Sequence, residues 1–156
     1  MKKLLIVLGL LVLTGCVAAE ESEKGDYTPG TYFGYEVMEG ERANVKLATI
    51  VVNEDGFIES VFLDATYNKD GVPHTKKALG DDYNMKPTSA NIGVIEGGAE
   101  WFEQANSLEA KVLEEQGLDW LTWVDEEETT TDAVSGVTMR VNGLVKAIEK
   151  ALEEAK

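Results

Sequence analysis

Apolar residues recur at different spacings in the two halves of the chain, and this change of period constrains the fold most. Residues 43–52 alternate as in a strand, with a different set of side chains on each face: Val45, Leu47, Thr49 and Val51 against Ala48, Ile50 and Val52. Residues 31–37 and 57–66 are also strand-like, and the turn sequence Asn53-Glu54-Asp55-Gly56 precedes the latter. We expect an antiparallel hairpin or meander, which a second turn sequence, Asn68-Lys69-Asp70-Gly71, should end.

The second half of the chain has helical spacing. One stripe predicts a helix over residues 99–116, with Gly117 as its C-cap: Trp101, Ala105, Leu108 and Val112. A second stripe predicts an amphipathic C-terminal helix: Val141, Leu144, Val145, Ile148 and Leu152. Residues 118–124 fit a strand or a helix, and residues 126–131 form an acidic, threonine-rich loop. The class is therefore α+β, a small antiparallel sheet with helices.

The N-terminus has the layout of an export signal. Lys2 and Lys3 precede ten apolar residues, which would span about 15 Å as a helix, half of a hydrocarbon core of roughly 30 Å. Residues 1–15 are therefore expected to be a cleaved signal peptide. Leu13-Thr14-Gly15-Cys16 resembles the bacterial lipobox, which implies that lipidated Cys16 anchors the protein in the lipid bilayer. The alternative is an ordinary secretory signal that happens to end in a cysteine.

The expected mature protein has 141 residues, enough for one domain. Residues 16–28 read as the lipidated cysteine with a flexible acidic spacer, and residues 29–156 as the folded domain. Loss of Lys2 and Lys3 takes the net charge from −15 to −17, which excludes nucleic acid as a ligand. Cys16 is the only cysteine and His74 the only histidine, so no intramolecular disulfide, His-based metal cluster or catalytic triad is expected.

Potential chemistry is concentrated just before the C-terminal helix, in Asp132-Ala133-Val134-Ser135-Gly136-Val137-Thr138. A loop that enters a helix directs backbone N–H groups and the positive end of the helix dipole at one point, which favours an anion. The alternative is an ordinary helix start, with Ser135 or Thr138 as the N-cap and Gly136 as a turn residue.

This segment resembles the flavinylation motif of the FMN-binding domain family, which includes the covalent-flavin subunits of the Na⁺-pumping quinone reductase and the Rnf complex. Asp132, Ser135, Gly136 and Thr138 match the motif, and Val137 departs from it because the family usually has alanine there. The resemblance implies that a flavin transferase attaches FMN covalently, through a phosphoester, to Thr138.

The likeness extends over residues 29–155 and implies an FMN-binding-domain-like fold that ends in the amphipathic C-terminal helix. Small lipoproteins of this family share the lipobox, acidic spacer, strand pair and C-terminal motif. Residues 75–85 and the sequence Glu100-Trp101-Phe102-Glu103-Gln104 are also similar to theirs.

A flavin ring needs an apolar or aromatic slot with a few polar partners. Four aromatic residues could supply its walls or belong to the core: Trp101, Trp120, Trp123 and Tyr83. Arg140 could neutralise the phosphodiester or be a solvated cation, and Lys76 or Lys77 could serve the same end.

The resemblance implies an electron-transfer carrier on the extracytoplasmic face of the cell membrane. It would take electrons from a membrane donor and pass them to an extracellular acceptor. One alternative is a non-catalytic binding or surface-antigen lipoprotein with a vestigial motif. Another is a reductase component, in which case the protein would act directly on a small acceptor.

Overall fold

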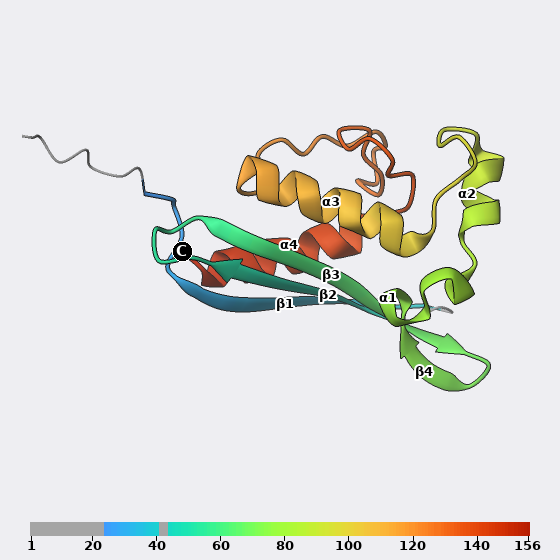
Figure 1. Ribbon diagram of the computed structural model, residues 1–156, viewed down its shortest axis with the longest axis horizontal. Helices are drawn as coiled ribbons and strands as arrows, with labels where there is room; N and C mark the ends of the chain where they lie inside the picture. The colour runs from blue at the N-terminus through green and yellow to red at the C-terminus, as the bar shows by residue number, and fades with distance from the viewer. Residues whose placement is uncertain (1–23, 41–43) are drawn as a thin grey trace, which may run out of the picture.

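The computed structural model describes residues 24–40 and 44–156 (Figure 1). Its elements follow one another along the chain in this order: β1 (Gly30–Met38), β2 (Asn44–Val52), β3 (Ile58–Lys69), β4 (Val72–Thr75), α1 (Lys76–Leu79), the 3-10 helix η1 (Gly80–Tyr83), α2 (Lys86–Ile92), α3 (Trp101–Glu115) and α4 (Asn142–Glu154). The described part of the chain is α+β, as the change of period predicts.

The sheet is an antiparallel meander of order β1-β2-β3-β4. Gly30 pairs with Val52 at one end of the β1–β2 ladder, and Met38 pairs with Asn44 at the other. The three expected strands are confirmed, but the prediction that the turn at Asn68–Gly71 ends the β region is wrong. Asp70 and Gly71 both have positive φ angles and link β3 to the short strand β4 as a tight hairpin.

Helices α3 and α4 cover one face of the sheet (Figure 1). Alternation in β2 directs Ala48, Ile50 and Val52 into this core, as expected. Both apolar helix stripes are buried against it, which confirms the two predicted helices. The largest fully buried side chains come from the sheet and from both helices and include Ile50, Leu63, Leu108, Leu144 and Ile148.

The structure differs from the expectations where elements are short. Helix α3 ends at Glu115, and the left-handed C-cap residue is Gln116, with φ of 57°, so the prediction of Gly117 as the C-cap is wrong by one residue. Residues 118–124 contain neither strand nor helix. Helices α1, η1 and α2 were not expected, because four to seven residues are too few to show a period.

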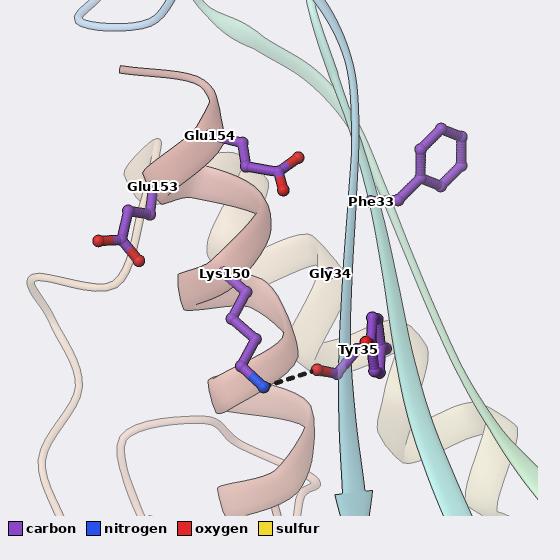
Figure 2. A pocket seen from close by; sticks show the side chains of 6 residues that line it. All are labelled: Phe33, Gly34, Tyr35, Lys150, Glu153 and Glu154. Carbon is purple, nitrogen blue, oxygen red and sulfur yellow. Dashed lines mark hydrogen bonds between the residues drawn. The ribbon is translucent and has the colours of Figure 1, made fainter.

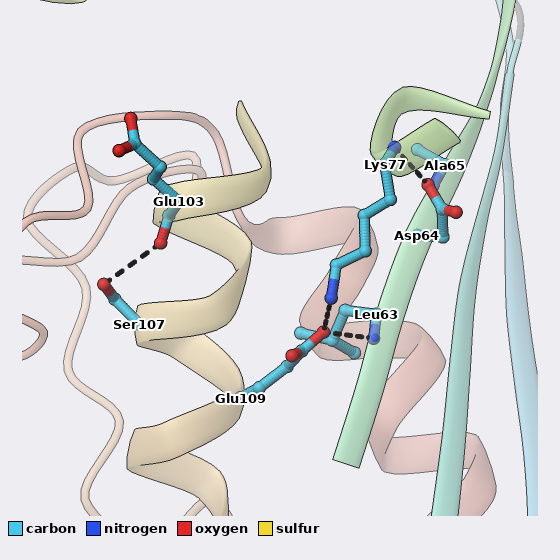
Figure 3. A network of polar contacts seen from close by, with 7 residues as sticks. All are labelled: Leu63, Asp64, Ala65, Lys77, Glu103, Ser107 and Glu109. Carbon is cyan, nitrogen blue, oxygen red and sulfur yellow. Dashed lines mark hydrogen bonds and ion pairs between the residues drawn. The ribbon is translucent and has the colours of Figure 1, made fainter. Parts of the chain in front are cut away.

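Side chains from the helices satisfy the outer edges of the sheet. Gln116 bonds both the N–H and the C=O of Ile58, at 2.6 and 3.0 Å, and Glu109 accepts the Leu63 N–H at 2.6 Å (Figure 3). On the opposite edge, the Lys150 ammonium donates to the Tyr35 carbonyl at 2.9 Å (Figure 2). These contacts occupy backbone groups that would otherwise be open to another strand.

The two ends of the described chain lie together. The N–H groups of Gly25 and Tyr27 donate to the β2–β3 turn, and that of Thr28 donates to the Ala155 carbonyl at 2.7 Å. Gly25, Tyr27 and Thr28, which the sequence assigns to the spacer, are therefore already bound to the domain. The expected signal peptide and Cys16 lie outside the described residues. None of the helices within residues 24–40 and 44–156 is long and apolar enough to cross a membrane.

Strand β1 meets α4 at Gly34 without space for a side chain (Figure 2). A Cβ on Gly34 would lie 1.8 Å from the Ala147 carbonyl oxygen, which is part of the helix backbone. We therefore expect Gly34→Ala to force β1 and α4 apart and to lower the free energy of unfolding by about 1–3 kcal/mol.

Urea unfolding of Gly34→Ala and Gly30→Ala measures this effect on one strand. At Gly30 the nearest atom to a new Cβ is the Tyr32 hydroxyl, at 3.1 Å, which lies at the end of a side chain. Gly30→Ala should stay within roughly 0.5 kcal/mol of the unmodified protein. Equal midpoints for the two variants would contradict the close approach.

Candidate functional site

The motif segment forms a series of turns before α4, not the start of that helix. Helix α4 begins at Asn142, and its N-cap residue is Val141, which makes no side-chain cap bond. The interpretation of Ser135 or Thr138 as N-cap is therefore wrong. The Val141 N–H donates to the Thr129 carbonyl at 2.9 Å, so the chain before the helix is held by the acidic loop.

The backbone at Thr138 is held by one buried carboxamide, that of Gln104 on α3. Its Oε1 atom accepts the N–H groups of Thr138 and Met139, at 2.8 and 3.0 Å. The Thr138 hydroxyl donates to the same oxygen at 3.4 Å, a long and weak bond. Gln104 is fully buried. The backbone of the motif is therefore fixed, whereas the Thr138 hydroxyl is only loosely engaged.

The buried amide is oriented by its other end. Gln104 Nε2 donates to Ser89 Oγ at 3.3 Å and to the Ala99 carbonyl at 3.4 Å. Ser89 lies on α2 and is also buried, and its Oγ accepts the Ala99 N–H. These contacts fix which end of the carboxamide faces Thr138, because only the oxygen can accept two N–H groups.

A buried carboxylate at the start of α3, that of Glu100, also holds neighbouring backbone in place. Glu100 is the N-cap of α3 and forms a capping box with Glu103. Its two oxygens also accept the N–H groups of Met85 and Lys86 at 2.8 and 3.0 Å, where α2 begins. Glu100 therefore joins the starts of α2 and α3, one turn before Gln104.

The acidic, threonine-rich loop is organised by Asp125. Its carboxylate accepts the backbone N–H and the hydroxyl of both Thr129 and Thr130, at 2.5–3.0 Å. These bonds, led by that from the Thr130 hydroxyl, lower the pKa of Asp125 to about 2. The sequence prediction of a loop is confirmed, but it missed this residue.

The predicted site residues differ in exposure. Thr138 is half-buried, whereas four others are exposed: Asp132, Ser135, Gly136 and Arg140. Gly136 has a φ of +81°, a left-handed conformation that favours glycine. Val137 is buried, so the larger side chain at the departure from the motif packs in the core.

The aromatic residues separate into two groups. Trp101 is buried and Tyr83 half-buried, and the Lys76 ammonium lies over both rings, 4.5 Å from the Tyr83 centroid and 5.3 Å from that of Trp101. Trp120 and Trp123 also pack against the core, and the Trp120 indole donates to the Gly117 carbonyl. Within residues 24–40 and 44–156, a cation lies over the rings of the first group and none over those of the second.

The two neighbouring lysines have different surroundings. Lys77 forms an ion pair with Glu109 at 2.5 Å, so a carboxylate already neutralises its charge (Figure 3). Its ammonium also lies 4.4 Å from the centroid of the Phe62 ring. Burial and the nearby charge of Lys46 lower the pKa of Lys76 to about 7, and Asp64 acts in the opposite direction. Burial also lowers the pKa of Lys46. Sequence reasoning missed Lys46, because its burial depends on the packing of α4.

No family model and no curated protein matches the chain. A solution NMR structure of a structural genomics target from Clostridium thermocellum is similar. It is 33% identical, covers 81% of this chain and 90% of its own, and superposes with a TM-score of 0.50. The chain therefore belongs to the same family as this clostridial protein, and the likeness supports the α+β fold.

Replacing Gln104 with leucine should loosen the motif. The change keeps the approximate side-chain size but leaves the N–H groups of Thr138 and Met139 without an acceptor, so the free energy of unfolding should fall by about 1–3 kcal/mol. Asn106→Leu, an exposed amide on the same helix, is the control and should change it by less than roughly 0.5 kcal/mol. Hydrogen exchange of the two amides measures the local effect, and unchanged protection in Gln104→Leu would rule out the clamp.

Lys76 should make stability depend on pH in a defined window. Its folded pKa of about 7 lies below the value near 10.4 of an unfolded lysine, so between these pH values the unfolded state binds more protons. The contribution of Lys76 to stability therefore rises with pH across this window. Below pH 7 the full cost of burying the charge applies.

Urea unfolding of the flavin-free protein at pH 6, 8 and 10 tests this dependence. Lys76→Met should be more stable than the unmodified protein at pH 6, with the difference shrinking toward zero at pH 10. The comparison cancels groups that titrate in both proteins. A difference that does not change with pH would show that Lys76 is not desolvated.

Proposed function

We propose that this protein carries FMN through a phosphoester to Thr138 and transfers electrons as a lipid-anchored carrier on the extracytoplasmic face of the cell membrane. The observation that carries the proposal is the placement of the motif. The residue that matches the flavin acceptor is the one whose backbone Gln104 holds from a buried position.

The residues around Thr138 fit a covalent phosphoester. The hydroxyl is half-buried and makes only a 3.4 Å bond, so a transferase can transfer FMN from a flavin dinucleotide to Oγ1, which loses its proton as the phosphoanhydride bond breaks and a nucleoside monophosphate leaves. Exposed Ser135 and Gly136 precede it on a turn, and the exposed Arg140 follows two residues later. Their exposure leaves one side of the acceptor open for the transferase.

The bound flavin would supply the redox chemistry, and the protein would supply position and electrostatics. Trp101 and Tyr83 offer an aromatic wall, and Lys76 offers a cation beside it. A covalent bond suits an exported carrier, because a dissociable cofactor would be lost outside the cell. The proposed partners are a flavin transferase for maturation and a membrane electron donor.

Flavin fluorescence in a denaturing gel tests the attachment. The domain from residue 24 onward is co-expressed with a flavin transferase, denatured and separated. We expect a fluorescent band for the unmodified protein and for Thr138→Ser, which keeps a hydroxyl, and none for Thr138→Ala. Thr122→Ala changes an exposed threonine outside the motif and should keep the fluorescence.

The fluorescence of the bands and the turnover of acceptors distinguish the proposed carrier from its alternatives. A dark band for the unmodified protein favours the alternative, a binding or surface-antigen lipoprotein with a vestigial motif. A fluorescent Thr138→Ala band would move the attachment to another residue. Turnover with small extracellular acceptors distinguishes a carrier from a reductase component, because a carrier has no substrate site that saturates.

A further inference from the structure

Lys46 on β2 and Lys76 on α1 form a pair of half-buried lysines, and Lys46 lies beside the first turn of α4. Lys46 lies on β2 with the same orientation as the core residue Ala48, and a Cβ on Gly143 of α4 would lie 2.8 Å from Lys46 Cγ. Lys46 pairs with Ala65 on β3, and the next residue of β3, Thr66, pairs with Thr75 on β4. Lys76 follows Thr75 as the first residue of α1, so the sheet register brings it near Lys46, whose charge acts on it. Desolvation and like charge both oppose two ammonium groups in one place. Such a pair is stabilised when an anion joins it.

The carboxylate that acts on Lys76 only partly compensates this charge. It belongs to Asp64, whose Oδ1 atom already accepts the N–H groups of Ala65 and Lys77, at 2.7 and 3.0 Å. The effects of burial and of Lys46 outweigh that of Asp64, since the pKa of Lys76 falls to about 7. The protein as a whole has a net charge of −15, so this cationic pair stands out against its surroundings.

The surroundings of Lys76 also suit a flat ring. Its ammonium lies over the rings of half-buried Tyr83 and buried Trp101, so the cation is held among aromatic side chains. Trp101 and Gln104 are three residues apart on α3 and lie on the same side of the helix. Because Gln104 holds Thr138, the lysine pair and the candidate acceptor are attached to the same turn of α3.

We propose that Lys76, with Lys46 beside it, binds the electron-rich edge of the flavin ring carried on Thr138 and favours its reduced form. This inference rests on the proposed function. Two-electron reduction of a flavin, with uptake of one proton, adds one negative charge to the ring. A quinol or reduced flavin of the membrane would supply the electrons in the cell. Dithionite supplies them in the test. A neighbouring ammonium lowers the free energy of this added charge, so it raises the midpoint potential.

Midpoint potentials of the flavin-loaded protein test the assignment. Reductive titration followed by absorbance compares the unmodified protein with Lys76→Met, Lys46→Met, Lys76→Arg and Lys77→Met. At a fixed solution potential, Lys76→Met should raise the ratio of oxidised to reduced flavin at least tenfold, which corresponds to about 30 mV for a two-electron couple. Lys46→Met should change it in the same direction by a smaller factor.

Two variants show whether charge at this position is responsible. Lys76→Arg keeps the cation, so it should change the ratio of oxidised to reduced flavin at a fixed solution potential by less than a factor of about two. Lys77→Met removes the neighbouring cation, which Glu109 already pairs, and should leave the potential unchanged. Circular dichroism and urea unfolding confirm that each titrated variant is folded. If Lys76→Met does not fold, the prediction for Lys46→Met decides the matter.

The two proposals fail in different ways. A loaded protein whose potential is the same in Lys76→Met, Lys46→Met and the unmodified form overturns the role of the lysine pair and leaves covalent attachment intact. An equal change in Lys77→Met also overturns it, because the effect would then be a general loss of charge. Absence of flavin from the unmodified protein overturns the proposed function, and this inference with it.

Discussion

The buried carboxamide of Gln104 is the contact on which the arrangement of the candidate site depends. It connects α3 to Ser89 on α2 and to the backbone at Thr138 and Met139, which are more than thirty residues away in the chain. A buried amide that is left half-satisfied costs more than it contributes. The start of α3, the position of α2 and the path into α4 are therefore coupled, and a change in one disturbs the others.

Much of the fold follows from local patterns. Strands β1, β2 and β3 alternate over nine to twelve residues, and α3 and α4 have apolar stripes over thirteen to fifteen, long enough for a period to appear. Strand β4 and helices α1 and α2 have four to seven residues. Long-range contacts position these short elements, such as the bonds from Glu100 to Met85 and Lys86. No single segment of sequence contains that information.

The candidate site could also be predicted from the sequence only in part. Thr138 could be proposed because a resemblance covers a continuous motif. The start of α4 was misplaced, because the bond from Val141 to Thr129 belongs to a loop contact that the motif does not reveal. Lys76 and Lys77 are equivalent in sequence, and only the fold separates them. Lys77 forms an ion pair with Glu109, whereas Lys76 lies over the rings of Tyr83 and Trp101. Chemistry that depends on which neighbour is buried beside a charge requires the structure.

The hydrogen bond from Thr28 to Ala155 would set the orientation of the domain under the proposed anchoring at Cys16. Helix α4 runs for thirteen residues, about 20 Å, from the Thr138 side of the molecule to this pinned end. Eight residues lie between Cys16 and Gly25, and fully extended they reach at most roughly 30 Å. A protein anchored at Cys16 would therefore present Thr138 at the end of the domain away from the membrane. The domain would have to rotate about its anchored end to bring Thr138 to a donor in the same membrane. In the proposed carrier, a shorter segment between Cys16 and Gly25 would slow electron uptake and leave delivery to soluble acceptors unaffected.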